Sequence, residues 1–155
     1  MSLFRYKRAL FAFCALLIVA AFLLFTAPGR LAVVQWNQAV WKYRAFHHYR
    51  YTFKNESLAF ASYLDGVVIE VRDNQTVSLS RKSNNQPLDP TIFREYNTMP
   101  KYFQQLASMI GRHPTKYIAL YNLQTGVPRY VNVDFSARTT DDEYILTVTD
   151  FEVLP

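Results

Sequence analysis

Residues 67–81 read VVIEVRDNQTVSLSR, and this stretch decides the class of the fold. Its first part, Val67–Arg72, alternates side chains at a period of two, as a half-buried strand does. Thr76–Arg81 has the character of a second short strand, and Asp73-Asn74-Gln75 lies between the two. Because Asp and Asn tolerate turn geometry, the stretch predicts an antiparallel hairpin.

The residues before the hairpin predict another strand and a helix. In HHYRYTFKN, residues 47–55, aromatic residues recur at every second position, which is typical of a half-buried strand. The segment 31–46, LAVVQWNQAVWKYRAF, has helical spacing instead, so we expect an amphipathic helix there. Its expected apolar face consists of Val33, Trp36, Val40 and Tyr43.

The residues after the hairpin predict a second helix and three further strands. The helix is expected over Thr98–Ile110, with Thr98 as its N-cap and Pro100 in the first turn, where no backbone N–H is needed. The strands are expected at Lys116–Tyr121, Pro128–Phe135 and Glu143–Phe151. The order α-β-β-β-α-β-β-β predicts an α+β fold, in which a mainly antiparallel sheet carries two helices on one side.

The segment that precedes this domain is long and apolar. Ala9–Ala27, ALFAFCALLIVAAFLLFTA, contains no charged residue. At about 1.5 Å per residue its 19 residues reach about 28 Å, close to the roughly 30 Å hydrocarbon core of a bilayer. We therefore predict a transmembrane helix, with the lipid bilayer as a partner. Cys14, the one cysteine, lies in this run, so no intramolecular disulfide can form.

The basic residues around the apolar run predict its orientation. Arg5, Lys7 and Arg8 precede the run, so the positive-inside rule places the N-terminus in the cytoplasm. The predicted division is a cytoplasmic tail at 1–8, a transmembrane signal anchor at 9–27 and an extracytoplasmic domain at 28–155. This division predicts a single-pass protein of the cytoplasmic (inner) membrane. The alternative is a cleaved signal, cut after Gly29, which would release a secreted domain.

The charge of the domain argues against nucleic-acid binding. The chain carries a net charge of +5, but from Arg30 onward 14 Lys and Arg face 12 Asp and Glu. A nucleic-acid-binding domain has a basic patch or stripe, and none is visible in the sequence. We therefore predict no nucleic-acid partner.

Several short patterns, taken in order, resemble a family of uncharacterised small bacterial exported proteins, the domain-of-unknown-function family six-one-seven-four. The resemblance covers roughly residues 36–153 and implies fold and export, but no activity, substrate or partner. Relatives often have cysteines after the first strand, where Asn55-Glu56-Ser57 stand here, and Asp in place of Asn122. The patterns are Trp41…Tyr43 with Tyr49-Arg50-Tyr51-Thr52, the Val67–Val77 hairpin, Thr98–Phe103, Tyr121…Gly126-Val127-Pro128, Val131–Asp134, and Asp142–Tyr144 with Val148–Phe151.

Acidic residues form the best chemical cluster of the sequence. The cluster consists of Asp134, Asp141, Asp142 and Glu143, and a hairpin between the last two strands would bring Asp134 near Asp142 or Glu143. Carboxylates so placed are ligands that Ca²⁺ prefers, so Asp134, Asp142 and Glu143 are weak candidates for a metal site. The alternative is a solvated hairpin end.

The remaining motifs predict no catalytic residue and no cofactor. His47 and His48 are neighbours in a strand and point to opposite faces, so they cannot chelate one ion together. Gly126-Val127-Pro128 is typical of a turn. No phosphate-binding glycine loop, nucleophile elbow or zinc-protease motif occurs.

We therefore expect a membrane-anchored extracytoplasmic binding or interaction module of a bacterial envelope, with another envelope protein as its partner. Two alternatives stay open: a metal-dependent or hydrolytic enzyme that uses the acidic hairpin, and an envelope assembly or folding helper. The expected binding surface is the non-core face of the sheet, although an antiparallel sheet can simply leave one face in water. The period-two pattern places on this face Arg50, Thr52, Glu70, Arg72, Tyr130, Asn132 and Asp134.

Overall fold

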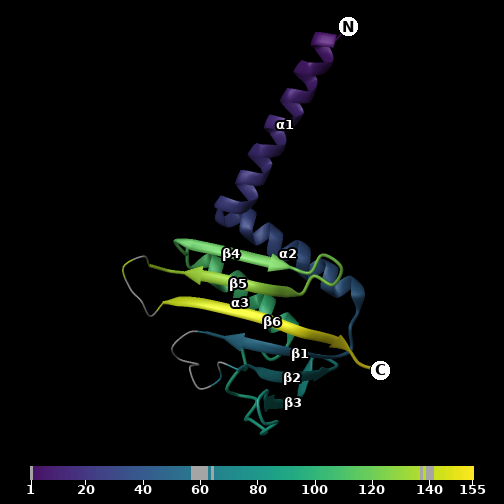
Figure 1. Ribbon diagram of the computed structural model, residues 1–155, viewed down its shortest axis with the longest axis vertical. Helices are drawn as coiled ribbons and strands as arrows, with labels where there is room; N and C mark the ends of the chain where they lie inside the picture. Colours follow the sequence, from purple (N-terminus) through teal and green to yellow (C-terminus); the bar gives the residue numbers. More distant parts are fainter. Residues whose placement is uncertain (1, 57–62, 64, 137, 139–141) are drawn as a thin grey trace.

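The computed structural model describes residues 2–56, 63, 65–136, 138 and 142–155 (Figure 1). Among these residues, two helices and six strands follow the N-terminal helix α1 in the predicted order. Their bounds are α1 Ser2–Phe25, α2 Ala27–Arg44, β1 His48–Asn55, β2 Val67–Arg72, β3 Gln75–Arg81, α3 Met99–Gly111, β4 Lys116–Tyr121, β5 Pro128–Asp134 and β6 Glu143–Val153.

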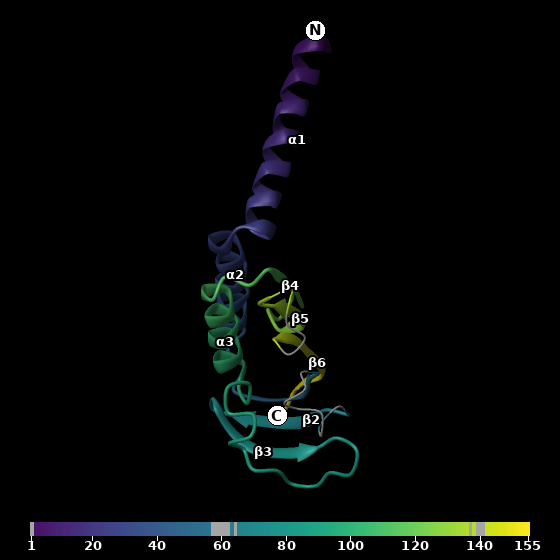
Figure 2. The same ribbon diagram turned by 90° about the vertical axis from the view of Figure 1, so that its left-hand side faces the viewer.

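The strands form one six-stranded sheet in the order β3-β2-β1-β6-β5-β4, and every neighbouring pair is antiparallel. The predicted α+β class and the antiparallel sheet are thus confirmed. Helices α2 and α3 lie against one face of this sheet (Figure 2). The first and last strands of the chain pair in its middle, so the two ends of the domain sequence meet there.

The β2–β3 hairpin has a two-residue turn. Asp73 and Asn74 both have positive φ, 48° and 61°, and Arg72 pairs with Gln75. Two successive residues with positive φ match the right-handed twist of the strands, which explains why Asp and Asn stand there. Gln75 belongs to β3 rather than to the turn.

Buried side chains of β1 form the centre of the core and contact the chain where it enters α3. Tyr49, Tyr51 and Phe53 are fully buried on the side of β1 that faces the helices, as predicted. The two tyrosine hydroxyl groups also form hydrogen bonds: Tyr51 Oη donates to the Tyr96 carbonyl at 2.6 Å, and Tyr49 Oη accepts from Met99 N–H at 3.1 Å. Two buried tyrosines therefore fix the entry of the chain into α3.

The predicted bounds and apolar face of α2 need correction. The helix begins at Ala27 instead of residue 31, because Thr26 Oγ1 accepts from Gly29 N–H at 3.1 Å and caps it. Its buried side chains are Val34, Asn37 and Trp41. The predicted face lies one position earlier along the chain and stays largely in solvent: Trp36 is 72% exposed and Tyr43 86%.

The apolar run of the sequence ends at a bend between two helices. Helix α1 ends at Phe25 and α2 starts at Ala27, and the two helices meet at 88°. Among the described residues, no single helix has both the length and the apolar character needed to cross a membrane. The bent pair Lys7–Phe22 and Ala27–Arg44 meets that requirement together, by length and composition.

Candidate functional site

The predicted binding residues lie on the sheet face opposite α2 and α3, which we call the outer face. Arg50 stands between Glu70 of β2 and Glu152 of β6 in the strand register. Its guanidinium is 2.8 Å from Glu152, and the His48 imidazole is 2.8 Å from Glu70. The charges of this face are therefore paired with one another across neighbouring strands.

Two of the predicted residues are not accessible. Thr52 is 3% exposed and Asn132 6%, although both belong to the outer face. Thr52 Oγ1 donates to Asp150 Oδ2 at 2.9 Å, and Asn132 Nδ2 donates to Glu143 Oε1 at 3.2 Å. Through these hydrogen bonds both side chains link neighbouring strands, Thr52 joining β1 to β6 and Asn132 joining β5 to β6.

Asp150 accepts several hydrogen bonds on the outer face, and the sequence analysis did not predict this role. Its carboxylate accepts from Lys82 Nζ at 2.8 Å and from the Thr52 hydroxyl at 2.9 Å. These hydrogen bonds, with that of Lys82 first, lower the pKa of Asp150. Asp150 has a positive φ of 52° beside a register shift between β1 and β6, so its backbone is shaped to present this carboxylate. The arrangement supports a structural role.

Two carboxylates of the acidic hairpin have separate partners. Asp134 and Glu143 are paired in the β5–β6 register, yet Asp134 Oδ1 accepts from Ser136 N–H at 2.9 Å. Lys116 Nζ lies 3.9 Å from Glu143. Asp141 is outside the described residues, and within the described part of the chain no three His, Cys, Asp or Glu residues form a metal-binding group. A calcium site that includes Asp142 stays a prediction.

The histidines are engaged separately, as expected from their positions. His47 Nδ1 lies 3.5 Å from Asp73 in solvent, whereas His48 is half-buried against Glu70. His113 follows α3 with a positive φ of 55°. The three imidazoles therefore belong to different surroundings.

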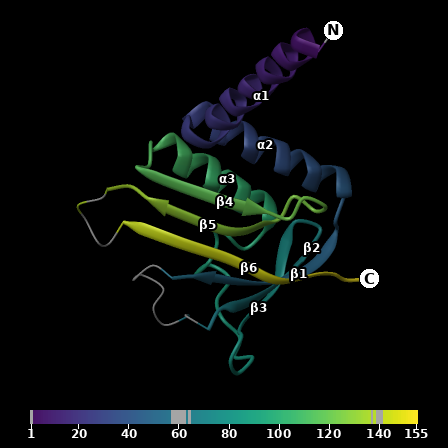
Figure 3. The ribbon, with the colours of Figure 1, turned by 45° about the horizontal axis from the view of Figure 1, so that its top comes forward.

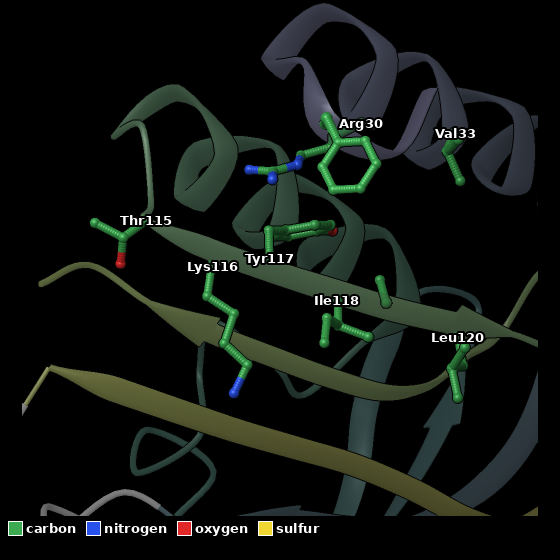
Figure 4. A pocket seen from close by; sticks show the side chains of 9 residues that line it. Arg30, Val33, Thr115, Lys116, Tyr117, Ile118 and Leu120 are labelled. Carbon is green, nitrogen blue, oxygen red and sulfur yellow. The ribbon is translucent and has the colours of Figure 1, made fainter. Parts of the chain in front are cut away.

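A mainly apolar groove lies between α2 and β4, near the bend. Its volume is about 450 Å³, within the size range of ligand pockets. Figure 4 shows Arg30 and Val33 of α2 on one side and the residues of β4 on the other. The lining residues are Phe25, Arg30, Val33, Thr115, Lys116, Tyr117, Ile118, Ala119 and Leu120.

Three buried tyrosine hydroxyl groups lie behind the groove. Those of Tyr102, Tyr117 and Tyr121 have no hydrogen-bond partner among the described residues. Tyr117 and Tyr121 affect each other electrostatically, but their hydroxyls are not in hydrogen-bond geometry. Burial raises the pKa of Tyr117 to about 12, so these phenols are neutral at physiological pH.

The sequence reasoning missed this groove. The sequence of β4 contained a signal for it. Tyr117, Ala119 and Tyr121 alternate with Ile118 and Leu120, so both sides of the strand are mainly apolar. Ile118 and Leu120 are among the exposed large apolar residues of the chain. An apolar strand with an exposed side indicates a contact surface.

Comparisons with known proteins identify a family. The model of a family of unknown function, DUF6174, matches residues 33–153, which confirms the resemblance seen in the sequence patterns. The search of curated proteins and the search of solved structures found no match. The match covers the domain from α2 to β6.

Proposed function

The chain belongs to the DUF6174 family of unknown function, and we propose that this protein is a membrane-tethered extracytoplasmic interaction module anchored by α1. The observation that carries the proposal is the exposure of α1. Every side chain from Lys7 to Phe22 is exposed, and this stretch includes large apolar residues such as Phe11 and Ile18. Contiguous apolar surface of this extent is costly in water and favourable in lipid.

The distribution of charge supports an orientation with the domain outside the cytoplasm. Three basic residues precede the apolar run, and only Arg30 stands close to its other end. Arg5, Lys7 and Arg8 stand before the apolar run, on the side that the positive-inside rule assigns to the cytoplasm. The bacterial and exported character of the protein is part of this proposal.

The position of Gly29 favours an uncleaved anchor over a secreted protein. Gly29 is buried in the first turn of α2, where its N–H bonds to the Thr26 hydroxyl. A cut after Gly29 would remove that capping residue and the first turn of a helix that packs on the domain. Capping contributes about 1 kcal/mol to a helix, so the cleaved domain would lose part of its own stability.

The anchor is tested by topology and extraction. Alkaline phosphatase fused after Pro155 is expected to be active in a bacterial host, and a carbonate wash is expected to leave the fusion in the membrane. A fusion to green fluorescent protein at the same position is the control, expected to be dark when exported by the Sec pathway. A soluble periplasmic fragment that begins near Arg30 would refute the anchor.

The interaction function is tested on the outer face with Arg72→Glu combined with Tyr130→Ala. Both side chains are accessible, unlike Thr52 and Asn132, so the unfolding midpoint is expected to change little. In-membrane crosslinking is expected to lose its adduct with the partner protein in this variant. Arg94→Glu, an exposed charge reversal in the segment before α3, is the control that should keep the adduct. An adduct retained by the double variant places the binding surface elsewhere.

A further inference from the structure

We propose that the groove between α2 and β4 binds one acyl chain of an anionic phospholipid from the membrane that holds α1. The inference rests on the proposed anchor and adds a ligand site to it. Phe25, the last residue of α1, is part of the groove lining. Lipid that surrounds α1 therefore borders the groove directly.

The position of the groove favours a membrane ligand. Helix α2 leaves α1 at 88°, so it runs parallel to the bilayer surface when α1 stands along the membrane normal. Strand β4 is the edge of the sheet nearest to α1 (Figures 1 and 3). The groove between these two elements is thus on the side of the domain from which α1 emerges.

The groove is polarised along its length, as an amphiphile is. Figure 4 shows Arg30, Thr115 and Lys116 toward one end, and Val33 and Leu120 toward the other. The Arg30 guanidinium lies 5.8 Å from the centre of the Tyr117 ring, in the range of a cation–π contact that holds it over the strand. A phosphate at the cationic end and a hydrocarbon chain along the apolar end match this distribution.

The charge of the lining selects an anionic headgroup. The lining contains two cations, Arg30 and Lys116, and no carboxylate. Figure 4 shows Lys116 and Leu120 on the side of β4 away from α2, while Tyr117 points toward Arg30. Lys116 Nζ lies 3.9 Å from Glu143, so Arg30, on the side of α2, is the cation of the lining that would meet a phosphate in the groove.

An extended peptide that adds to β4 is the competing occupant, because an edge strand offers unpaired backbone groups. The opposite edge, β3, is shielded by an isolated bridge between Ser80 and Pro87. Lipid is favoured at β4 because Phe25 and the exposed apolar side chains of α1 lead into the groove, and because the lining has cations at one end only.

The test uses the full chain in vesicles of phosphatidylcholine and phosphatidylglycerol. These contain a trace of phosphatidylglycerol that carries a photoreactive diazirine on its acyl chain. Crosslinks are expected on β4 and on the first turns of α2, besides those on α1. Ala119→Phe fills the groove, and it is expected to lower the β4 crosslinks severalfold and leave those on α1 unchanged. Ala39→Phe makes the same change at an exposed position of α2 outside the lining, and should have no effect.

Headgroup selectivity is measured with Arg30→Gln. This variant is expected to crosslink equally to photoreactive phosphatidylglycerol and phosphatidylcholine, whereas the unchanged protein prefers the first. Val33→Phe narrows the groove from the helix side and replaces Ala119→Phe if that variant misfolds, as judged by circular dichroism. The same lowering of the β4 crosslinks is expected.

Three results would overturn the proposal. They are crosslinks confined to α1, β4 crosslinks that persist in the folded groove-filling variants, and a β4-mediated dimer that Ala119→Phe dissociates while no lipid is attached to β4. Loss of crosslinks from α1 as well, together with release of the protein by carbonate, would instead refute the anchor itself.

Discussion

At the scale of single residues, Gly126 fixes the β4–β5 turn against α2. It has a positive φ of 76°, and an added Cβ would overlap the Asn37 carbonyl oxygen and lie 3.0 Å from Trp41 N. Both reasons exclude a side chain, since L residues rarely adopt this φ and the neighbouring atoms are helix backbone. Arg44 Nε donates to the Gln124 carbonyl at 2.7 Å and supports the same contact.

Gly126→Ala is therefore expected to lower the free energy of unfolding by more than about 1 kcal/mol, since alanine is strained at positive φ and displaces the turn. Gly111→Ala is the matched control. Nothing lies within 4 Å of its added Cβ, and alanine is the better helix former by up to about 1 kcal/mol. Urea unfolding of both variants checks the pair. A Gly126→Ala variant as stable as the control would show that the turn does not contact α2.

At the scale of elements, the strands could be predicted because their signals are local. Period-two alternation located β1 and β2, and Asp73-Asn74 has the turn geometry that its residue types favour. The bounds of α3 were recovered because Thr98 caps it with its side chain, which accepts from Lys101 N–H at 3.4 Å. Each of these signals depends only on neighbouring residues.

The face of α2 could not be predicted, because two sets of residues share helical spacing. Val33 and Trp36 form one set, and Val34, Asn37 and Trp41 the other. Hydrophobicity favoured the first, since burial of Asn37 looks costly. In the structure, Asn37 Nδ2 donates to the Val33 carbonyl at 2.9 Å, so its amide is buried with a partner and that cost is reduced.

The two tryptophans of α2 test this assignment. Trp41 is 4% exposed and packs on Phe46 and Tyr49, with ring centroids 5.0 and 4.9 Å apart, so Trp41→Ala is expected to cost about 3–5 kcal/mol. Trp36→Ala is expected to cost less than about 1 kcal/mol, because Trp36 is exposed. Denaturant titration in detergent measures both. A larger loss for Trp36→Ala than for Trp41→Ala would mean that the face predicted from the sequence is the buried one.

At the scale of the whole molecule, the candidate sites depend on topology that no local pattern contains. The outer face could be assigned by alternation, but the link from Asp150 to Thr52 joins residues 98 positions apart. The groove exists because β4 is the edge of the sheet and α2 passes beside it. Both facts follow from the pairing of β1 with β6, which brings the last three strands next to the first three.

The buried phenols make the fold as a whole sensitive to alkali. Burial raises the pKa of Tyr49, Tyr96 and Tyr117 to about 12, and that of Tyr51, Tyr102 and Tyr121 still higher. In an unfolded chain the same groups titrate near 10. The folded state therefore binds more protons above pH 10, and its stability falls as the pH rises from about 10 through 12 and beyond.

We expect alkaline unfolding to be cooperative and coupled to tyrosine ionisation. Between pH 10 and 12 the tyrosinate absorbance should lag behind that of the urea-unfolded chain, and the buried phenols should then ionise together as the circular dichroism of the sheet is lost. These six groups span β1, β4, α3 and the segment before α3, so ionisation of a buried phenol disturbs the packing between these elements. A smooth titration near pH 10 with the circular dichroism intact would contradict the buried tyrosine core, and with it the position of β4 against α3.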